Sequence, residues 1–383
     1  MMNEICQQEK CTGCSACAET CPKDCIAMIP DGEGFFRPSV EESICVSCGL
    51  CQKVCPVNNP IRDDGKEPDA FAVRHRNAEI RKDSSSGGAF SALAMQTLAK
   101  GGAVIGAGFD KAYMVIHKVC FHESELDELR RSKYVQSDIH GTFREARMLL
   151  DSGKMVLFCG TPCQIGGIKA YLGKEYLNLY TVDFICHGVP SPAAWKKYLE
   201  FREKEAGKKA KGVSFRSKTK GWQKYSLEIH FQNGRKYCGA VSEDFYLRSF
   251  IMDMDLRPSC YHCDFKQIHR QADITLADFW GIDCMDTDWN DDTGVSLVMI
   301  HSEKGWKLMN AVDVDLEVRS VSLTDALACN PSMTQSVWKP ALREHFMKDL
   351  NQLPFDKLHE RYCGTGLASR VRRKVAQTFS KWK

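Results

Sequence analysis

The sequence CTGCSACAETCP at residues 11–22 is followed by CVSCGLCQKVCP at residues 45–56, and the two stretches share one cysteine pattern. Each stretch reads Cys-x2-Cys-x2-Cys-x3-Cys-Pro. This is the bacterial ferredoxin run, in which three thiolates bind one iron–sulfur cube and the fourth binds the neighbouring cube. The two-residue gaps wrap the chain around one cube, and the x3-Cys-Pro step turns it towards the other. The pattern therefore predicts two 4Fe-4S clusters.

The crossing of the fourth cysteine decides which residues share a cluster. We expect one cluster on Cys11, Cys14, Cys17 and Cys55, and the other on Cys21, Cys45, Cys48 and Cys51. The alternatives are zinc knuckles or disulfides. Zinc sites take four ligands each and show no preference for this run, so iron–sulfur chemistry is favoured. Such clusters transfer electrons one at a time.

The composition indicates a globular protein with more than one domain. The chain has 383 residues, of which 43% are hydrophobic and 26% are charged, an ordinary balance. Residues 1–10 lack the apolar segment of a signal peptide, and no run approaches the ~18 apolar residues of a membrane span. The 20 cysteines are then expected to be ligands or reduced thiols. We predict a cytoplasmic protein of an anaerobic cell, because exposed cubes react with oxygen.

The net charge of +3 hides a basic C-terminal end. Residues 361–383 contain seven basic side chains and no acidic one. Leu367, Val371, Val375 and Phe379 recur at every fourth position there, which predicts a short amphipathic helix. It could rest on anionic lipid at the inner membrane face, or dock on its own domain. Nucleic acid is not expected as a partner, because neither a basic face nor a recognisable module is present.

The chain divides into segments of different pattern. We predict a ferredoxin-type domain at 1–60, a linker at 61–68, two parts of a larger body at 69–150 and 151–340, and a basic helical tail at 341–383. Strands are expected at 70–74, 103–109, 155–158, 177–185, 225–231, 235–238, 273–277 and 295–300, and helices at 89–98 and 192–205. Asn233-Gly234 is a strong hairpin signal. The predicted fold class is α+β, with a small two-cluster module before a mixed-sheet α/β body.

The stretch SSSGG at residues 84–88 precedes the helix expected at 89–98. Small residues let backbone N–H groups approach an anion, and a helix N-terminus supplies positive potential, so this is a candidate phosphate site. A plain helix start with a good N-terminal cap is the structural alternative.

A second group of cysteines follows predicted strands in the body. Loops at strand ends tend to bind ligands in open α/β sheets. Four thiolates from three loops would suffice for a third cluster, namely Cys163, Cys186, Cys260 and Cys263. Cys159 competes with Cys163 for one ligand position. Buried structural thiols are the alternative, because cysteine is commonly buried.

Three further residues are candidates for catalysis or cofactor contact. His187 follows Cys186 in a glycine-containing loop and could position a substrate or stabilise a reduced flavin, or it could be structural. Asp278 ends a strand beside Phe279 and Trp280, where it could contact a flavin or ribose. Lys133 lies next to an aromatic residue. The alternative to a functional role for Lys133 is that it belongs to a solvated basic edge of the protein.

The motifs in this order resemble the coenzyme F420 hydrogenase/dehydrogenase beta-subunit family over roughly residues 5–330. The matching elements are the two-cluster module, SSGG at 85–88, GTPCQ at 160–164, CHGVPS at 186–191, CxxC at 260–263 and ADITLADFWG at 272–281. The resemblance implies FAD and a third 4Fe-4S cluster in the body. It makes Ser85, Ser86, Gly87, Gly88, Lys133, Gly160, Thr161 and Asp278 the candidate FAD contacts, with His187 and Lys133 as candidate catalytic residues.

The resemblance also suggests the reaction class. We expect an iron–sulfur flavoprotein oxidoreductase that passes electrons between ferredoxin-type clusters and FAD, with a deazaflavin-like or other small-molecule substrate. A ferredoxin or an oxidoreductase subunit is the expected protein partner. A non-catalytic electron-transfer subunit is the main alternative, and an iron–sulfur sensor without flavin is a third.

Overall fold

The computed structural model describes residues 4–60, 65–139, 141–285, 287–364, 366–367, 369, 371 and 374. The first part of the predicted linker, residues 61–64, and most of the predicted amphipathic tail lie outside the described residues. Within the described part, no helix is long and apolar enough to cross a membrane. Nothing there supports lipid contact by the tail.

The two cysteine runs of the N-terminal module fold alike. In each run the residues flanking the second cysteine have positive φ, which is 69° at Gly13, 65° at Ser15, 53° at Ser47 and 74° at Gly49. Left-handed residues are uncommon outside glycine, and here they bend the chain tightly at the cysteines. The elements of the module are β1 (Ile26–Pro30) paired antiparallel with β2 (Phe36–Val40), and the one-turn helices α1 (Ala16–Glu19) and α2 (Leu50–Lys53).

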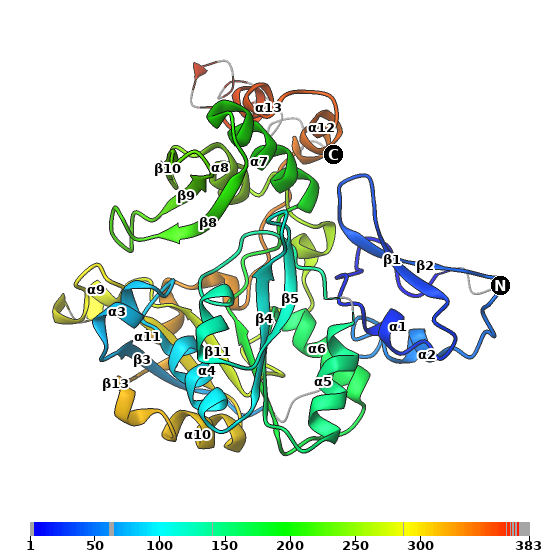
Figure 1. Ribbon diagram of the computed structural model, residues 1–383, viewed down its shortest axis with the longest axis vertical. Coiled ribbons are helices and arrows are strands. Elements are labelled where there is room, and N and C mark those ends of the chain that lie inside the picture. Colours follow the sequence, from blue (N-terminus) through cyan, green and yellow to red (C-terminus); the bar gives the residue numbers. More distant parts are fainter. Residues whose placement is uncertain are drawn as a thin grey trace.

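The body is built on an eight-stranded mixed sheet in the order β13-β3-β12-β11-β7-β6-β4-β5 (Figure 1). Four neighbouring strands, β4, β6, β7 and β11, run parallel to one another, and the outer pairs are antiparallel. The strands are β3 (Asp69–His75), β4 (Ala103–Phe109), β5 (Val115–Cys120), β6 (Val156–Cys159), β7 (Leu179–Phe184), β11 (Ile274–Asp278), β12 (Ser296–Ile300) and β13 (Leu316–Val321).

Helices cover both faces of this sheet. Helices α4 (Ala89–Ala99) and α10 (Glu303–Asn310) pack on one face, and α5 (Thr142–Asp151) and α6 (Pro162–Leu172) pack on the other. Side chains alternate between the faces along a strand, so Val104 joins the first core and Ile105 the second. The carboxyl ends of β4, β6, β7 and β11 meet at one edge, where ligands bind in sheets of this type.

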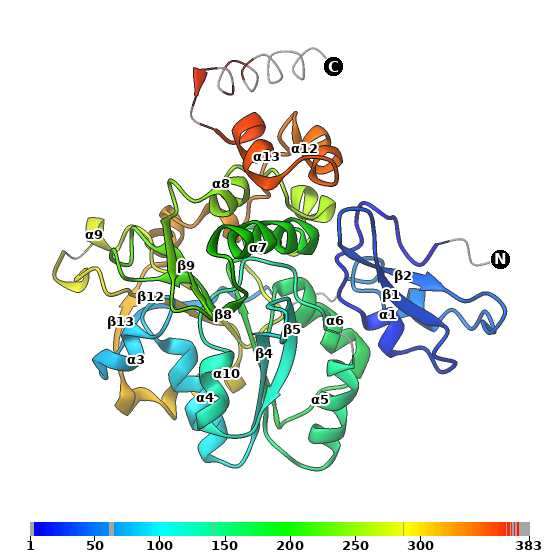
Figure 2. The same ribbon diagram turned by 45° about the horizontal axis from the view of Figure 1, so that its top comes forward.

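A smaller antiparallel sheet, ordered β10-β9-β8, forms a separate layer with four helices around an aromatic core (Figure 2). Its elements are α7 (Pro192–Ala206), β8 (Ala210–Ser217), β9 (Ser226–Phe231), β10 (Lys236–Ala240), α8 (Phe245–Ile251), α12 (Arg343–Leu350) and α13 (Phe355–Tyr362). The remaining short elements are α3 (Ala78–Lys82), η1 (Glu123–Glu128), η2 (Pro258–His262), α9 (Ile282–Met285), η3 (Thr287–Trp289), η4 (Asp313–Asp315), α11 (Leu323–Ala328) and η5 (Pro331–Met333).

The mixed sheet, the expected strands and the Asn233-Gly234 turn between β9 and β10 are confirmed. The helix expected at 89–98 begins at Ala89 as predicted. Gly88 occupies its N-cap position with φ of 95°, and no side chain caps α4. The predicted boundary at residue 150 falls within one continuous sheet, because β3 and β4 pair with strands beyond it. The subdivision stays a prediction.

Candidate functional site

The N-terminal module packs directly against helix α6, and both ribbon views place α1 beside it (Figures 1 and 2). The contact depends on one glycine. A Cβ on Gly167 would lie 3.0 Å from the Cβ of Cys14 and 3.2 Å from its sulfur. Residues of α1, α5 and α6 share one apolar core. The absence of a side chain on Gly167 therefore lets the Cys14 thiol approach the body.

Polar contacts fix the module on the other side. Arg343, which is 1% exposed, donates through Nη1 to Glu33 at 2.6 Å and through Nη2 to the carbonyl of Leu256 at 2.8 Å. The carbonyl of Gly32 accepts from Asn351 at 3.1 Å. Helix α12 of the body therefore joins the loop between β1 and β2.

The module's eight predicted ligands divide between two small cavities as the crossing pattern predicts. The inner set, nearer the body, is Cys11, Cys14, Cys17 and Cys55. The outer set is Cys21, Cys45, Cys48 and Cys51. Burial is the main cause that raises the pKa of Cys14 to about 12. Such a buried thiol opposes ionisation unless a bound cationic centre stabilises the thiolate. Four predicted ligands converge on each cavity, and this donor chemistry fits an iron–sulfur cluster in both.

Two further cysteines, which carried no recognisable spacing in the sequence, lie at these cavities. Cys6 lines the inner cavity and lies within hydrogen-bonding range of Cys11 and Cys55. Cys25 lines the outer cavity, with its sulfur 3.4 Å from that of Cys21. Only the folding of the chain brings these two thiols to the cavities.

The four predicted thiols of the body also come together, and we call Cys163, Cys186, Cys260 and Cys263 the body set. Burial and the nearby Cys263, Cys186 and Cys260 raise the pKa of Cys163 well above its usual range. In contrast, the pKa of Cys159 responds to burial, Asp183 and Lys133 rather than to the thiols of this set. The geometry thus favours Cys163 over Cys159 as a member of the body set.

The sequence explains how the body set is positioned. Cys163 lies in the first turn of α6, two residues after the capping residue Thr161, whose hydroxyl lies 3.1 Å from the Cys163 sulfur. Cys186 follows β7, and Cys260 lies in the turn η2. The backbone N–H of Val189 donates to the Cys260 sulfur at 3.4 Å. Among the described residues, no group of three or more His, Cys, Asp or Glu side chains is spaced for a single metal ion.

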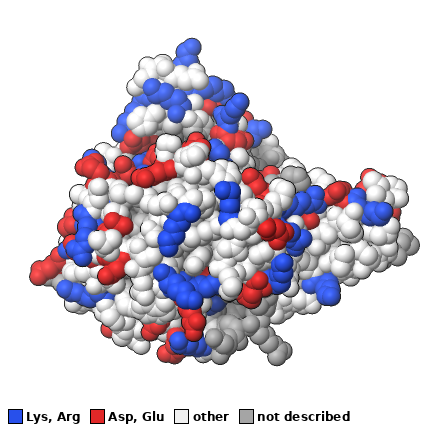
Figure 3. Space-filling model, turned by 60° about the horizontal axis from the view of Figure 1, so that its bottom comes forward, with Lys and Arg blue, Asp and Glu red and all other residues white. Residues whose placement is uncertain are grey.

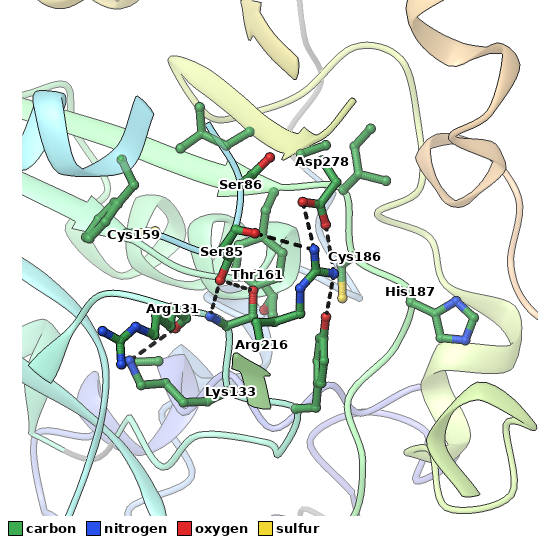
Figure 4. Close-up of a pocket in the computed structure, with 18 of the residues that line it drawn as sticks. Ser85, Ser86, Arg131, Lys133, Cys159, Thr161, Cys186, His187, Arg216 and Asp278 are labelled. Carbon is green, nitrogen blue, oxygen red and sulfur yellow. Dashed lines mark hydrogen bonds and ion pairs between the residues drawn. The ribbon is translucent and has the colours of Figure 1, made fainter. Parts of the chain in front are cut away.

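A cavity of about 550 Å³ opens at the carboxyl edge of the parallel strands (Figure 4). All the predicted FAD contacts line it except Gly87, namely Ser85, Ser86, Gly88, Lys133, Gly160, Thr161 and Asp278. Gly87 is instead held against the sheet, where its N–H donates to Ser296 Oγ at 3.0 Å and its carbonyl accepts from His75 at 2.7 Å. Cys186 also lines the cavity, so the body set borders it.

One end of this cavity suits an anion. The uncapped first turn of α4 contributes Gly88, Ala89, Phe90 and Ser91 to the lining, and Arg130, Arg131 and Lys133 lie in a neighbouring segment of it. Unpaired N–H groups and the helix dipole favour negative charge at such a position. A phosphate-containing group therefore fits this end.

Arg216 was not predicted from the sequence, because it comes from β8 of the smaller sheet. Its side chain is 2% exposed, and its guanidinium lies 3.0 Å from the Asp278 carboxylate and 4.0 Å from the centre of the Tyr225 ring. It also donates to the carbonyl of Ser85 at 3.4 Å. Figure 4 shows this group in the middle of the cavity. The Arg216–Asp278 ion pair therefore joins the smaller sheet to the large sheet, and it places polar groups in the lining of the cavity.

The two candidate catalytic residues are held by their own partners. Burial lowers the pKa of Lys133 to about 7, and its Nζ donates to the carbonyls of Glu128 at 2.9 Å and Arg130 at 2.7 Å. His187 Nε2 lies 2.6 Å from Asp253 Oδ1, and its ring projects away from the Arg216–Asp278 pair in Figure 4. Their catalytic roles stay predictions.

On the face shown in Figure 3, positive and negative side chains are interspersed. This distribution differs from the one-signed face that nucleic-acid binding requires.

The fold and the thiol sets define the class as an iron–sulfur protein. Residues 10–59 match a 4Fe-4S dicluster domain, and residues 153–325 match the family described as the C terminus of the coenzyme F420 hydrogenase/dehydrogenase beta subunit. The predicted resemblance is confirmed. Residues 153–325 are thus similar to this family, and an N-terminal ferredoxin-type domain precedes them.

Individual relatives agree with these matches. The chain is 24% identical to the coenzyme F420-dependent sulfite reductase of Methanocaldococcus jannaschii over 327 residues, which cover 82% of this chain and 47% of the reductase. The chain thus spans about half the length of that relative. Over 58 residues, 15% of this chain and 68% of the other, it is 36% identical to the 7Fe ferredoxin of Hydrogenibacillus schlegelii.

A solved structure was also found to be similar. A chain of the F420-reducing [NiFe] hydrogenase complex from Methanosarcina barkeri aligns with a TM-score of 0.46 and 20% identity, covering 80% of this chain and 97% of the other.

Proposed function

We propose that the chain is an iron–sulfur flavoprotein oxidoreductase. In this proposal the inner and outer sets each hold a 4Fe-4S cluster, the body set holds a third, and FAD occupies the 550 Å³ cavity. When bound, FAD would exchange a hydride equivalent with a deazaflavin-like or other small molecule and exchange single electrons with the clusters.

The observation that carries the proposal is that the inner set, the body set and the cavity adjoin one another in this order. Gly167 contacts Cys14 of the inner set, and Cys163 of the body set lies one helical turn before it on the same helix. Cys186 then borders the cavity. An electron would therefore pass from the outer set to the inner set, to the body set and to the cavity, or in reverse, without leaving the protein.

The two ends of the cavity favour one orientation of FAD. The diphosphate fits the uncapped start of α4, and the flavin ring then extends towards Cys186 and Arg216. The Arg216–Asp278 pair is suited to orient polar edges of the ring or ribose, because both side chains are held by several partners.

Cofactor content tests the proposal. The full chain purified without oxygen should contain about twelve iron atoms, three clusters of four, and one released FAD per chain. About eight irons without flavin would leave only the ferredoxin module and reject the proposal for the body. Iron and FAD without turnover of a deazaflavin or dye would favour the electron-transfer subunit instead.

The substitution Ser85→Asp tests where FAD binds. The Ser85 oxygen accepts from the Ser132 N–H at 2.7 Å, and a carboxylate can still accept this bond. Its charge should oppose the diphosphate and weaken FAD binding about tenfold, ~1.4 kcal/mol, in a fluorescence titration of the flavin-free full chain.

Asn77→Asp is the matched control for this charge. Asn77 caps α3 outside the cavity, and aspartate is an equally good cap. Equal FAD affinity of the two variants would contradict the proposed diphosphate position.

A further inference from the structure

Arg257 is a buried cation at the junction of the module and the body. Its side chain is 1% exposed. The guanidinium donates to the carbonyl of Cys11 at 2.7 Å, to the carbonyl of Phe36 at 2.9 Å and to Gln136 Oε1 at 2.7 Å, and its Nη2 lies 3.6 Å from the Cys11 sulfur. Every oxygen acceptor is neutral, and no carboxylate pairs with Arg257 in the described part of the chain.

A buried charge of this kind is unfavourable unless an opposite charge compensates it. Another cation near the inner set, Arg37, is already paired with Asp31 at 2.7 Å. A cube bound by four thiolates carries net negative charge, which increases by one unit on reduction. The inner set is therefore the group in contact with Arg257 that can balance its charge.

The same residue also contacts the body set through its backbone. The Arg257 N–H donates to the carbonyl of Val189 at 3.0 Å, and its carbonyl accepts from the N–H of Cys260 at 2.9 Å. Gly13 makes room for the guanidinium, since a Cβ there would lie 2.8 Å from Nη1. Arg257 thus joins a ligand candidate of the inner set to one of the body set.

The outer set has no equivalent cation among the described residues. The backbone N–H of Ser47 donates to the Cys45 sulfur at 3.4 Å. Within the described ranges, no charged side chain donates to the sulfur of Cys21, Cys45, Cys48 or Cys51. Hydrogen bonds to sulfur and local charge are two factors that set the potential of a cluster.

We propose that Arg257 is a positioning residue that stabilises the reduced inner cluster relative to the outer one, so that electrons collect beside the body set. This inference rests on the proposed function, because it requires a cluster on the inner set. In the step, the outer cluster loses one electron and the inner cluster gains it. The electron enters the outer cluster from an external one-electron donor, and the guanidinium keeps its proton.

The substitution Arg257→Gln in the full chain tests the inference. It should lower the equilibrium constant for one-electron reduction of one N-terminal cluster about tenfold, which is about 59 mV. The measurement is an anaerobic redox titration followed by electron paramagnetic resonance, with iron content determined in parallel. Arg257→Lys keeps the charge and should shift the potential less than Arg257→Gln.

Arg343→Gln is the matched control. Arg343 is equally buried and also binds the module, but its acceptors are Glu33 and the Leu256 carbonyl rather than any thiol. The Arg343→Gln substitution should leave the reduction potentials of both N-terminal clusters unchanged. An equal shift in this control, or no shift in Arg257→Gln at full iron content, would overturn the inference and leave the proposed function standing.

If the Arg257→Gln chain does not retain the inner cluster, Gln136→Glu provides a second test of the same inference. The new carboxylate would face Nη1 at the present 2.7 Å contact and neutralise the guanidinium without removing it. The same cluster should again become harder to reduce, and an unchanged potential at full iron content would reject the inference. Absence of iron from the inner set in the unaltered chain would instead reject the proposed function.

Discussion

Valine at position 167 is expected to interrupt electron transfer between the module and the body. Gly167 has no side chain where Cys14 approaches, and a Cβ would already lie 3.2 Å from the Cys14 sulfur. The larger branched side chain of valine must displace α1 or α6, and overpacking of this kind costs about 1–3 kcal/mol. We expect stopped-flow reduction to bleach the N-terminal clusters normally while flavin reduction becomes much slower.

Gly32→Val is the control for the change in residue type. Gly32 also belongs to the module and its carbonyl contacts Asn351, but a Cβ there would meet nothing within 4 Å. Flavin reduction should then proceed at the rate of the unaltered chain. A Gly167→Val chain with unimpaired flavin reduction would show that electrons do not pass along this contact.

Removal of the Cys163 thiol is expected to eliminate one whole cluster. Cys163→Ala takes away the member of the body set that α6 supplies, and a cube with three ligands at this site should not be retained. Iron should fall from about twelve to about eight atoms per chain, which is one cluster of four. Iron analysis and the visible spectrum measure the change.

Cys159→Ala is the corresponding comparison, because Cys159 lies four residues earlier and lines the cavity itself. It should keep the full iron content. Loss of four irons from Cys159→Ala, with none lost from Cys163→Ala, would reverse the ligand assignment.

The module was predictable because its chemistry is local in the sequence. Two runs of four cysteines fix both the cluster type and the crossing of Cys21 and Cys55, and the two cavities divide the thiols in the same way. The GTPCQ and CxxC motifs likewise located the body set. The choice between Cys159 and Cys163 needed the structure, since it depends on which side of the strand–helix turn each thiol faces.

Other parts of the site have no local signal. Arg216 lies on a strand of a different sheet, and Arg257 reaches a module whose last residue is about 200 positions earlier in the chain. Gly166 and Gly167 would read as unfavourable residues in a helix. The structure explains them by close packing, since a Cβ would lie 2.9 Å from Phe265 of the body at Gly166 and 3.0 Å from Cys14 of the module at Gly167.

The docking of the module links iron supply to the lifetime of the whole chain. Small metal-binding domains commonly fold only when their ligands are loaded. If the module were unfolded, Arg343 and Arg257 would lose the partners that cover them in the body. In a cell short of iron, the body would then expose the side chains of Arg343 and Arg257 and the apolar surface of α6. Chains of this kind are open to proteolysis, so degradation would remove those chains whose clusters cannot be completed.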